Sequence, residues 1–95
     1  MPRSSRVNPD AVRFGALIQR LRLERGWTIG KLAQRSGMNR TYLGILEKGG
    51  NLPTLATLFE LADVLNTTAT EMVREVEEGR RSARAKRAVP PPAAE

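Results

Sequence analysis

The chain contains no cysteine and no histidine among its 95 residues. This excludes disulfides, thiolate nucleophiles, the usual zinc ligands and the commonest general base. No glycine-rich phosphate loop and no paired carboxylates on one helical face stand in for them. We therefore expect no catalytic residues, no metal and no cofactor, and a protein that is not an enzyme. The lack of cysteine also fits a cytoplasmic protein.

Long apolar runs are missing as well, since none approaches the roughly 20 residues that a membrane span needs. The basic start of the chain, Met1 to Arg6, is not followed by an apolar signal segment. Leu and Ala dominate the apolar residues and favour helix over strand. The sequence thus predicts a soluble, cytoplasmic, all-α protein with no membrane partner and, at this length, one domain.

Negative charge is scarce in the first half of the chain. Residues 3–48 carry ten basic and three acidic side chains, residues 49–78 carry one and six, and residues 79–95 carry five and one. The front half should attract a polyanion, and the back half of the core should not. Charge alone is equally compatible with an ordinary solvated surface.

Cap and turn signals divide the chain into five expected helices. The expected N-cap residues are Asn8, Thr28, Asn39, Thr54 and Thr68. The expected helix ends lie near Gly26, Arg35, Lys48, Asn66 and Gly79. We interpret residues 1–8 as a disordered arm, 9–78 as the domain and 79–95 as a basic, Pro-rich disordered tail.

The second and third expected helices, with the turn at Gly37, form a helix-turn-helix pattern. From Phe14 to Val73 the chain resembles the phage repressor/Cro, or XRE-type, family. The matching segments are Leu21-Arg22 with Gly26-Trp27-Thr28, Leu32-Ala33 with Ser36-Gly37, Asn39-Arg40-Thr41-Tyr42-Leu43, Leu46-Glu47-Lys48-Gly49, and Pro53-Thr54-Leu55. The Arg40-Thr41-Tyr42 and Asn51-to-Leu55 segments are similar to restriction–modification controller proteins. The resemblance implies a five-helix repressor-like domain that binds double-stranded DNA.

Such a domain places its third helix in the major groove, with the N-terminal residues leading. The candidate base contacts on its outer face are Arg40, Thr41, Tyr42, Gly44 and Ile45. Arg40 can donate two hydrogen bonds to guanine, while Thr41 and Ile45 suit a thymine methyl. Tyr42 is as compatible with packing on the turn as with a base contact, and Gly44 leaves room for close approach.

Candidate contacts to the DNA phosphates flank this helix. They are Thr28, Lys31, Asn39, Lys48 and Asn51. The family often has Gln directly after the second helix's cap, where it binds phosphate, but this chain has Ile29. The resemblance also implies a largely buried ion pair between Arg22 and Glu47, whose role is structural. The alternative is two exposed charges.

One such helix contacts only a few base pairs, so we expect a homodimer on a palindromic site with half-sites about 34 Å apart. The candidate dimer residues are Leu65, Met72, Val73 and Val76, although some of them, Met72 first, can instead close the monomer core. The leading hypothesis is a transcriptional regulator. The alternative is the antitoxin of a toxin–antitoxin pair, with the fifth helix or the tail binding a protein partner.

Overall fold

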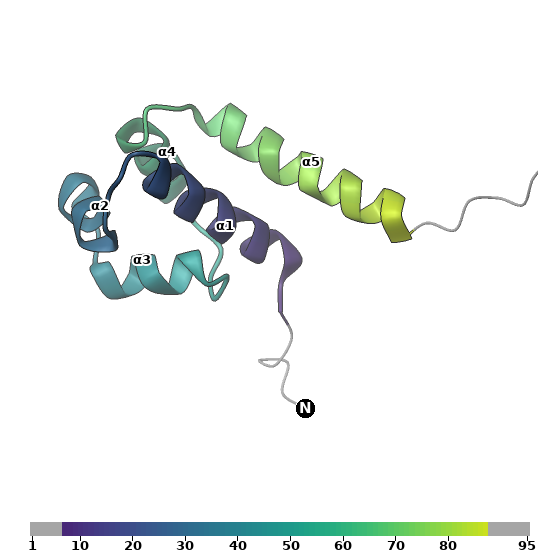
Figure 1. Ribbon diagram of the computed structural model, residues 1–95, viewed down its shortest axis with the longest axis horizontal. Coiled ribbons are helices and arrows are strands. Elements are labelled where there is room, and N and C mark those ends of the chain that lie inside the picture. The colour runs from purple at the N-terminus through teal and green to yellow at the C-terminus, as the bar shows by residue number, and fades with distance from the viewer. Residues whose placement is uncertain (1–6, 88–95) are drawn as a thin grey trace, which may run out of the picture.

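The structure is a computed structural model, and it describes residues 7–87. In this range the chain forms helices and no strand, which confirms the predicted all-α fold (Figure 1). The helices are α1 (Pro9–Glu24), α2 (Ile29–Ser36), α3 (Arg40–Glu47), α4 (Leu55–Val64) and α5 (Ala69–Arg87). The expected arm over residues 1–6 and the tail over residues 88–95 lie outside the described residues.

Each helix begins where a short polar side chain accepts hydrogen bonds from the first turn. Asn39 Oδ1 accepts from the amide of Tyr42 at 3.0 Å, and Thr28 Oγ1 accepts from the amide of Lys31 at 3.0 Å. Asn8, Thr54 and Thr68 do the same for α1, α4 and α5. All five predicted N-caps are confirmed, because a cap depends on residues three positions apart and is visible in the local sequence.

The five helices enclose one apolar core. Its fully buried members are Ile18, Leu32, Leu43, Leu46, Leu61, Leu65 and Met72. α1 lies between α3 on one side and α5 on the other, and α2 contacts both α3 and α4 (Figure 1). No helix within residues 7–87 is long and apolar enough to cross a membrane.

α1 crosses the C-terminal end of α3 at close range. A Cβ atom on Gly15 would lie 2.6 Å from the carbonyl oxygen of Glu47 and closer still to that of Leu46. Two turns further on, Arg22 Nε and Nη2 donate to the two carboxylate oxygens of Glu47 at 2.7 and 2.9 Å. Arg22 Nη1 also donates to the carbonyl of Trp27 at 2.8 Å. The ion pair that the family resemblance implies is therefore present, and it fixes α3 on α1.

This ion pair is largely removed from water, with 11% of the Arg22 side chain and 5% of the Glu47 side chain exposed. Its hydrogen bonds to Glu47 raise the pKa of the Arg22 guanidinium above its ordinary value, against the opposing effect of burial. Arg22 therefore keeps its positive charge inside the fold.

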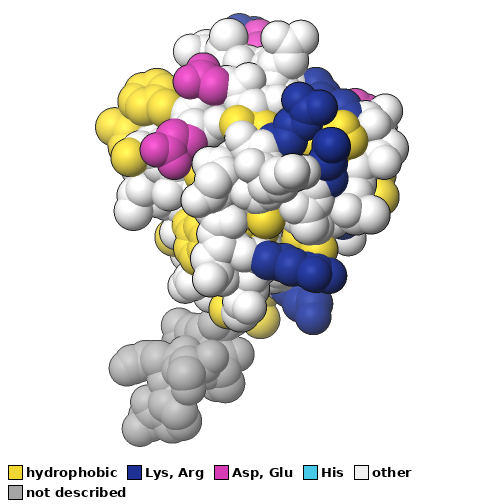
Figure 2. Space-filling model, turned by 90° about the vertical axis from the view of Figure 1, so that its left-hand side faces the viewer, with side chains coloured by type: hydrophobic (Ala, Val, Ile, Leu, Met, Phe, Trp, Pro, Cys, Tyr) yellow, Lys and Arg dark blue, Asp and Glu magenta, His cyan; other side chains and the backbone are white. Residues whose placement is uncertain are grey.

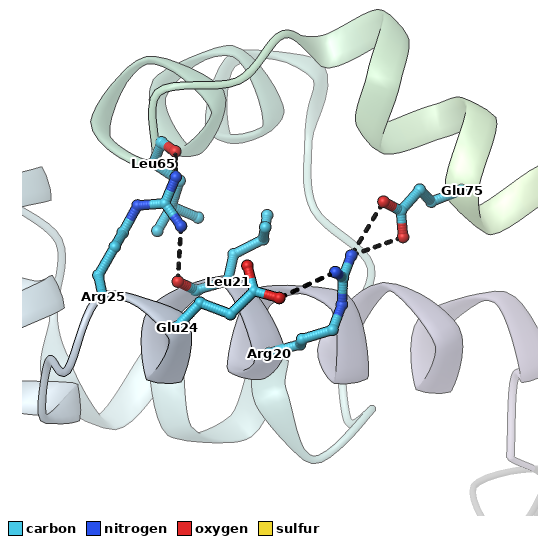
Figure 3. Close-up of polar contacts among 6 residues, drawn as sticks. All are labelled: Arg20, Leu21, Glu24, Arg25, Leu65 and Glu75. Carbon is cyan, nitrogen blue, oxygen red and sulfur yellow. Dashed lines mark hydrogen bonds and ion pairs between the residues drawn. The ribbon is translucent and has the colours of Figure 1, made fainter.

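Two further arginines join α1 to α5 and to the end of α4 (Figure 3). Arg20 donates to both carboxylate oxygens of Glu75 in α5, at 2.7 and 2.9 Å, and to Glu24 at 3.2 Å. Arg25 donates to the carbonyl of Leu21 at 2.8 Å and to the carbonyl of Leu65 at the end of α4. Helix α1 is thereby tied to α4 and α5 through its exposed and half-buried side chains.

The predicted end of the last helix at Gly79 is wrong, because α5 continues to Arg87. Gly79 lies where α5 packs on α1, and a Cβ there would come within 2.9 Å of Arg13 Cδ. The following turn is held by Arg80, which pairs with Asp10 at 3.5 Å, while Arg81 pairs with Glu77 at 3.9 Å. Residues 79–87 are therefore helix and not part of a disordered tail.

Two of the four candidate dimer residues close the monomer core instead, which is the alternative that the sequence offers for this set, with Met72 first. Leu65 is 0% exposed and Met72 is 1% exposed, so both belong to the core and neither can meet a second chain. Val76 is half-buried and packs against the core, while Val73 is exposed. The helical period of α5 places Met72 and Val76 on its inner face, four residues apart, and Val73 beside it.

We expect the Glu47→Ala variant to lose about 3–5 kcal/mol of its free energy of unfolding, because Arg22 would stay buried without its partner. Urea denaturation followed by circular dichroism at 222 nm measures the loss. An exposed pair provides the matched control: Glu24→Ala removes a carboxylate beside Arg20 and should cost less than about 1 kcal/mol. Equal small losses from both variants would contradict the bracing role of the buried pair.

Candidate nucleic-acid interface

The turn between α2 and α3 is fixed by local hydrogen bonds. Gly37 takes a positive φ of 72°, and its amide donates to the carbonyl of Ala33 at 2.9 Å. The hydroxyl of Ser36 accepts from the amide of Met38 at 3.2 Å, and Met38 packs against the core. Since only glycine adopts this φ without strain, the turn and the angle between the two helices are set by the sequence.

Helix α3 has one buried face and one open face. Leu43 and Leu46 are completely buried, whereas Arg40, Thr41 and Ile45 are exposed. These three side chains share the outer surface with Gly44, as the sequence predicts. Tyr42 is half-buried and packs against the core, so it lies at the edge of this surface. The outer face of α3 is thus a ridge of small and polar side chains on a helix that is anchored from behind.

The predicted phosphate contacts lie at the two ends of this ridge. Lys48 and Asn51 are exposed beyond the C-terminal end of α3, and Lys31 is half-buried on α2. Thr28 and Asn39 use their side-chain oxygens as N-caps, so those oxygens are occupied by the chain itself. The caps take the amides of Lys31 and Tyr42, so the remaining amides of each first turn, which have no partner inside the helix, are left for an anion.

The structure brings Arg40 next to the first turn of α2. Its guanidinium carbon and Nη1 lie 4.0 Å from the point where Gly30 would carry a Cβ. The two residues belong to different helices, and the turn at Gly37 brings them together. A basic side chain therefore stands beside the helix end whose dipole is already positive, which strengthens the attraction for an anion there.

This chain has Ile29 directly after the cap of α2, where the family often has Gln, and the structure gives this residue a different role. Its side chain is half-buried and packs against the core instead of pointing outward. The polar contact that the family often makes there is replaced by an apolar anchor for α2, while the backbone amides keep their place.

Acidic side chains are nearly absent from this half of the molecule. Glu47 is the only one between Glu24 and Glu60 in the sequence, and Arg22 neutralises it. Figure 2 views the face with α2 and the start of α3, where Lys and Arg gather along one side and the largest visible patches of Asp and Glu lie on the other. The surface next to α3 is therefore positive, as its composition predicts.

Sequence reasoning missed the support that α2 receives from Arg35. Its guanidinium lies 5.0 Å from the centre of the Trp27 ring, which is a cation–π contact. Trp27 precedes α2 and Arg35 lies within it, eight positions later, so no short sequence motif indicates the contact. Within the described residues no group of three or more His, Cys, Asp and Glu side chains is arranged to hold a metal ion.

Comparison with known proteins agrees with this geometry. The family model described as Helix-turn-helix (HTH_3) matches residues 18–72. The HTH-type transcriptional regulator y4dJ of Sinorhizobium fredii is 41% identical over 64 residues, which cover 67% of this chain and 83% of that protein.

Solved structures with a similar fold include two regulators. The restriction-modification controller protein C.AhdI from Aeromonas hydrophila gives a TM-score of 0.65 at 32% identity, covering 68% of this chain and 98% of that one. The biofilm regulator SinR, in a crystal structure with DNA, gives a TM-score of 0.60 at 24% identity, covering 63% and 97%. The SinR likeness is one of fold alone. From its matched residues and its close relatives, the chain belongs to the XRE-type helix-turn-helix family and is a DNA-binding transcriptional regulator.

Proposed function

We propose that the chain binds a palindromic operator as a homodimer and places α3 of each protomer in the major groove. The observation that carries this proposal is the outer face of α3, where Arg40, Thr41 and Ile45 are exposed on a helix anchored by Leu43 and Leu46. A helix of about 10–12 Å diameter matches a groove of about 12 Å width. The family to which the chain belongs is one of DNA-binding regulators, which agrees with this partner.

Each exposed side chain of α3 has a specific counterpart on DNA. Arg40 suits the O6 and N7 atoms of guanine, and the methyl groups of Thr41 and Ile45 suit a thymine methyl. The first-turn amides of α2 and the ammonium of Lys48 then hold the backbone on either side of the groove. Base contacts choose the sequence, while backbone contacts fix the register.

Selection from a random duplex library, followed by fluorescence-anisotropy titration at physiological salt, tests this function. We expect a palindromic sequence to be enriched and to bind about 1,000-fold more tightly than a scrambled duplex of equal length, which is a modest ratio for specific regulators. A preference of less than tenfold would exclude a sequence-specific role. The protein would then be a general DNA binder.

We expect Arg40→Ala to lower discrimination at a single base-pair position by about 1–3 kcal/mol. Lys48→Ala should instead weaken binding to every sequence alike and lower the slope of log Kd against log salt by about one. Both variants are measured on the enriched duplex and on duplexes changed one position at a time. Because Arg40 also lies beside α2, a uniform loss with a lower salt slope for Arg40→Ala would identify it as a phosphate contact.

For the dimer we propose the groove between α4 and α5 in place of the buried Leu65 and Met72. The groove measures about 570 Å³, and its lining includes Leu55, Phe59 and Val73, which are 67%, 53% and 51% exposed. Arg74, Arg81, Glu77 and Glu78 line the same groove, so it carries both signs of charge. In an isologous dimer the same patch of each protomer faces its copy in the other, so the patch must be complementary to itself. A patch with apolar side chains and both signs of charge meets this requirement.

The variant Phe59→Ser should shift the protein from dimer to monomer and weaken operator binding at least tenfold, because the two half-sites would no longer be bound together. Sedimentation equilibrium gives the mass of each form. Leu23→Ser is the matched control, since Leu23 is an apolar residue of similar exposure on α1, away from this groove. If the Phe59→Ser protein stays dimeric, the dimer interface does not lie in this groove.

A further inference from the structure

At two of the eight glycines, nothing within the chain requires the absence of a side chain. Three have a positive φ, namely Gly26, Gly37 and Gly49. Another three lie where an added Cβ would come within 3.0 Å of another part of the chain, namely Gly15, Gly50 and Gly79. The remaining two are Gly30 and Gly44, and neither has a positive φ. Their lack of a side chain therefore needs another explanation.

The space around Gly44 is empty. A Cβ atom on this residue would meet nothing within 4 Å. At Gly30 the nearest neighbours would be Thr28 Oγ1 at 3.8 Å and the Arg40 guanidinium at 4.0 Å, which are ordinary contact distances. An alanine would fit at both positions without any movement of the chain.

Both residues also lie inside short helices, where glycine is less favourable than every residue except proline. Gly44 is the fifth of the eight residues of α3, and Gly30 is the second residue of α2. Glycine lowers the stability of helices that are only two turns long, and the fold gains nothing in return. A compensating gain must then arise in contact with something outside the chain.

The two positions share one surface. Gly44 follows Arg40 and Thr41 by one helical turn and precedes Lys48 by one turn, so these exposed side chains surround it. Gly30 lies beside the Arg40 guanidinium. Both glycines are therefore on the face that the proposed function turns toward DNA, and they are in the two helices that form the helix-turn-helix.

We propose that Gly30 and Gly44 set the distance of closest approach to double-stranded DNA. This inference rests on the proposed function. At Gly44 the missing side chain lets base edges come into contact with the backbone of α3. At Gly30 it lets a backbone phosphate reach the amides of the first turn of α2. The chain gives up helix stability at these two positions in exchange for a closer fit to the duplex.

Alanine substitutions separate stability from binding. Gly44→Ala should raise Tm by roughly 4–8 °C, and Gly30→Ala, in the first turn, should raise Tm by less. Each should weaken operator binding tenfold or more, because the added methyl group would overlap atoms of the duplex that lie against the glycine. Gly44→Leu should weaken binding further. The salt slope of Gly44→Ala should stay at its wild-type value, since no cation is removed.

Gly79→Ala is the matched control, because it makes the same change in the middle of α5, away from α2 and α3, and the added Cβ would displace the Arg13 side chain, whose Cδ would lie 2.9 Å away. It should leave operator affinity within twofold of wild type. Thermal denaturation gives Tm, and anisotropy titration on the selected operator gives Kd.

The inference is overturned if Gly44→Ala and Gly30→Ala bind the operator within twofold of wild type, or if both lower Tm. It is also overturned if Gly79→Ala weakens binding as much as they do. None of these results affects the proposed function, which depends on the sequence preference of the unaltered protein.

Discussion

The close crossing of α1 and α3 is the contact on which the DNA-binding surface depends. Gly15 lets the backbones approach until a single added carbon would collide with two carbonyl oxygens. The Arg22–Glu47 pair then holds the same two helices together two turns further along α1, with both charges largely removed from water. Together they fix where α3 stands and how far it protrudes. A recognition helix only two turns long has little stability of its own, so its direction must come from such contacts.

The rest of the molecule extends this anchoring in two directions. Toward the DNA-binding side, the positive φ of Gly37 and the half-buried Met38 fix α2 relative to α3. On the opposite side, Arg20 and Arg25 tie α1 to α5 and to the end of α4. A regulator with this construction can present its outer side chains in one arrangement before it meets DNA, which lowers the entropy lost on binding.

Local sequence signals predicted the parts of the fold that depend on neighbouring residues. All five N-caps and the exposed face of α3 follow from patterns that span three or four positions. The end of α5 could not be predicted in this way, because Gly79 breaks a helix only where no other helix packs against it. The complete burial of Leu65 and the Arg20–Glu75 pair, 55 positions apart, likewise depend on tertiary contacts, whereas burial of Met72 is among the alternatives that the sequence offers. The Arg22–Glu47 pair could be anticipated only through a family resemblance.

The residues that position α3 are separate from those on its outer surface, and this separation has an evolutionary consequence. Gly15, Arg22 and Glu47 lie on the inside, whereas Arg40, Thr41 and Ile45 lie on the outside. Substitutions at the outer positions leave the inner contacts untouched, so they should change which operator is recognised at little cost in folding. After gene duplication, one copy could acquire a new target through a few replacements on a single surface. The scaffold would stay constant while its regulatory targets diverged.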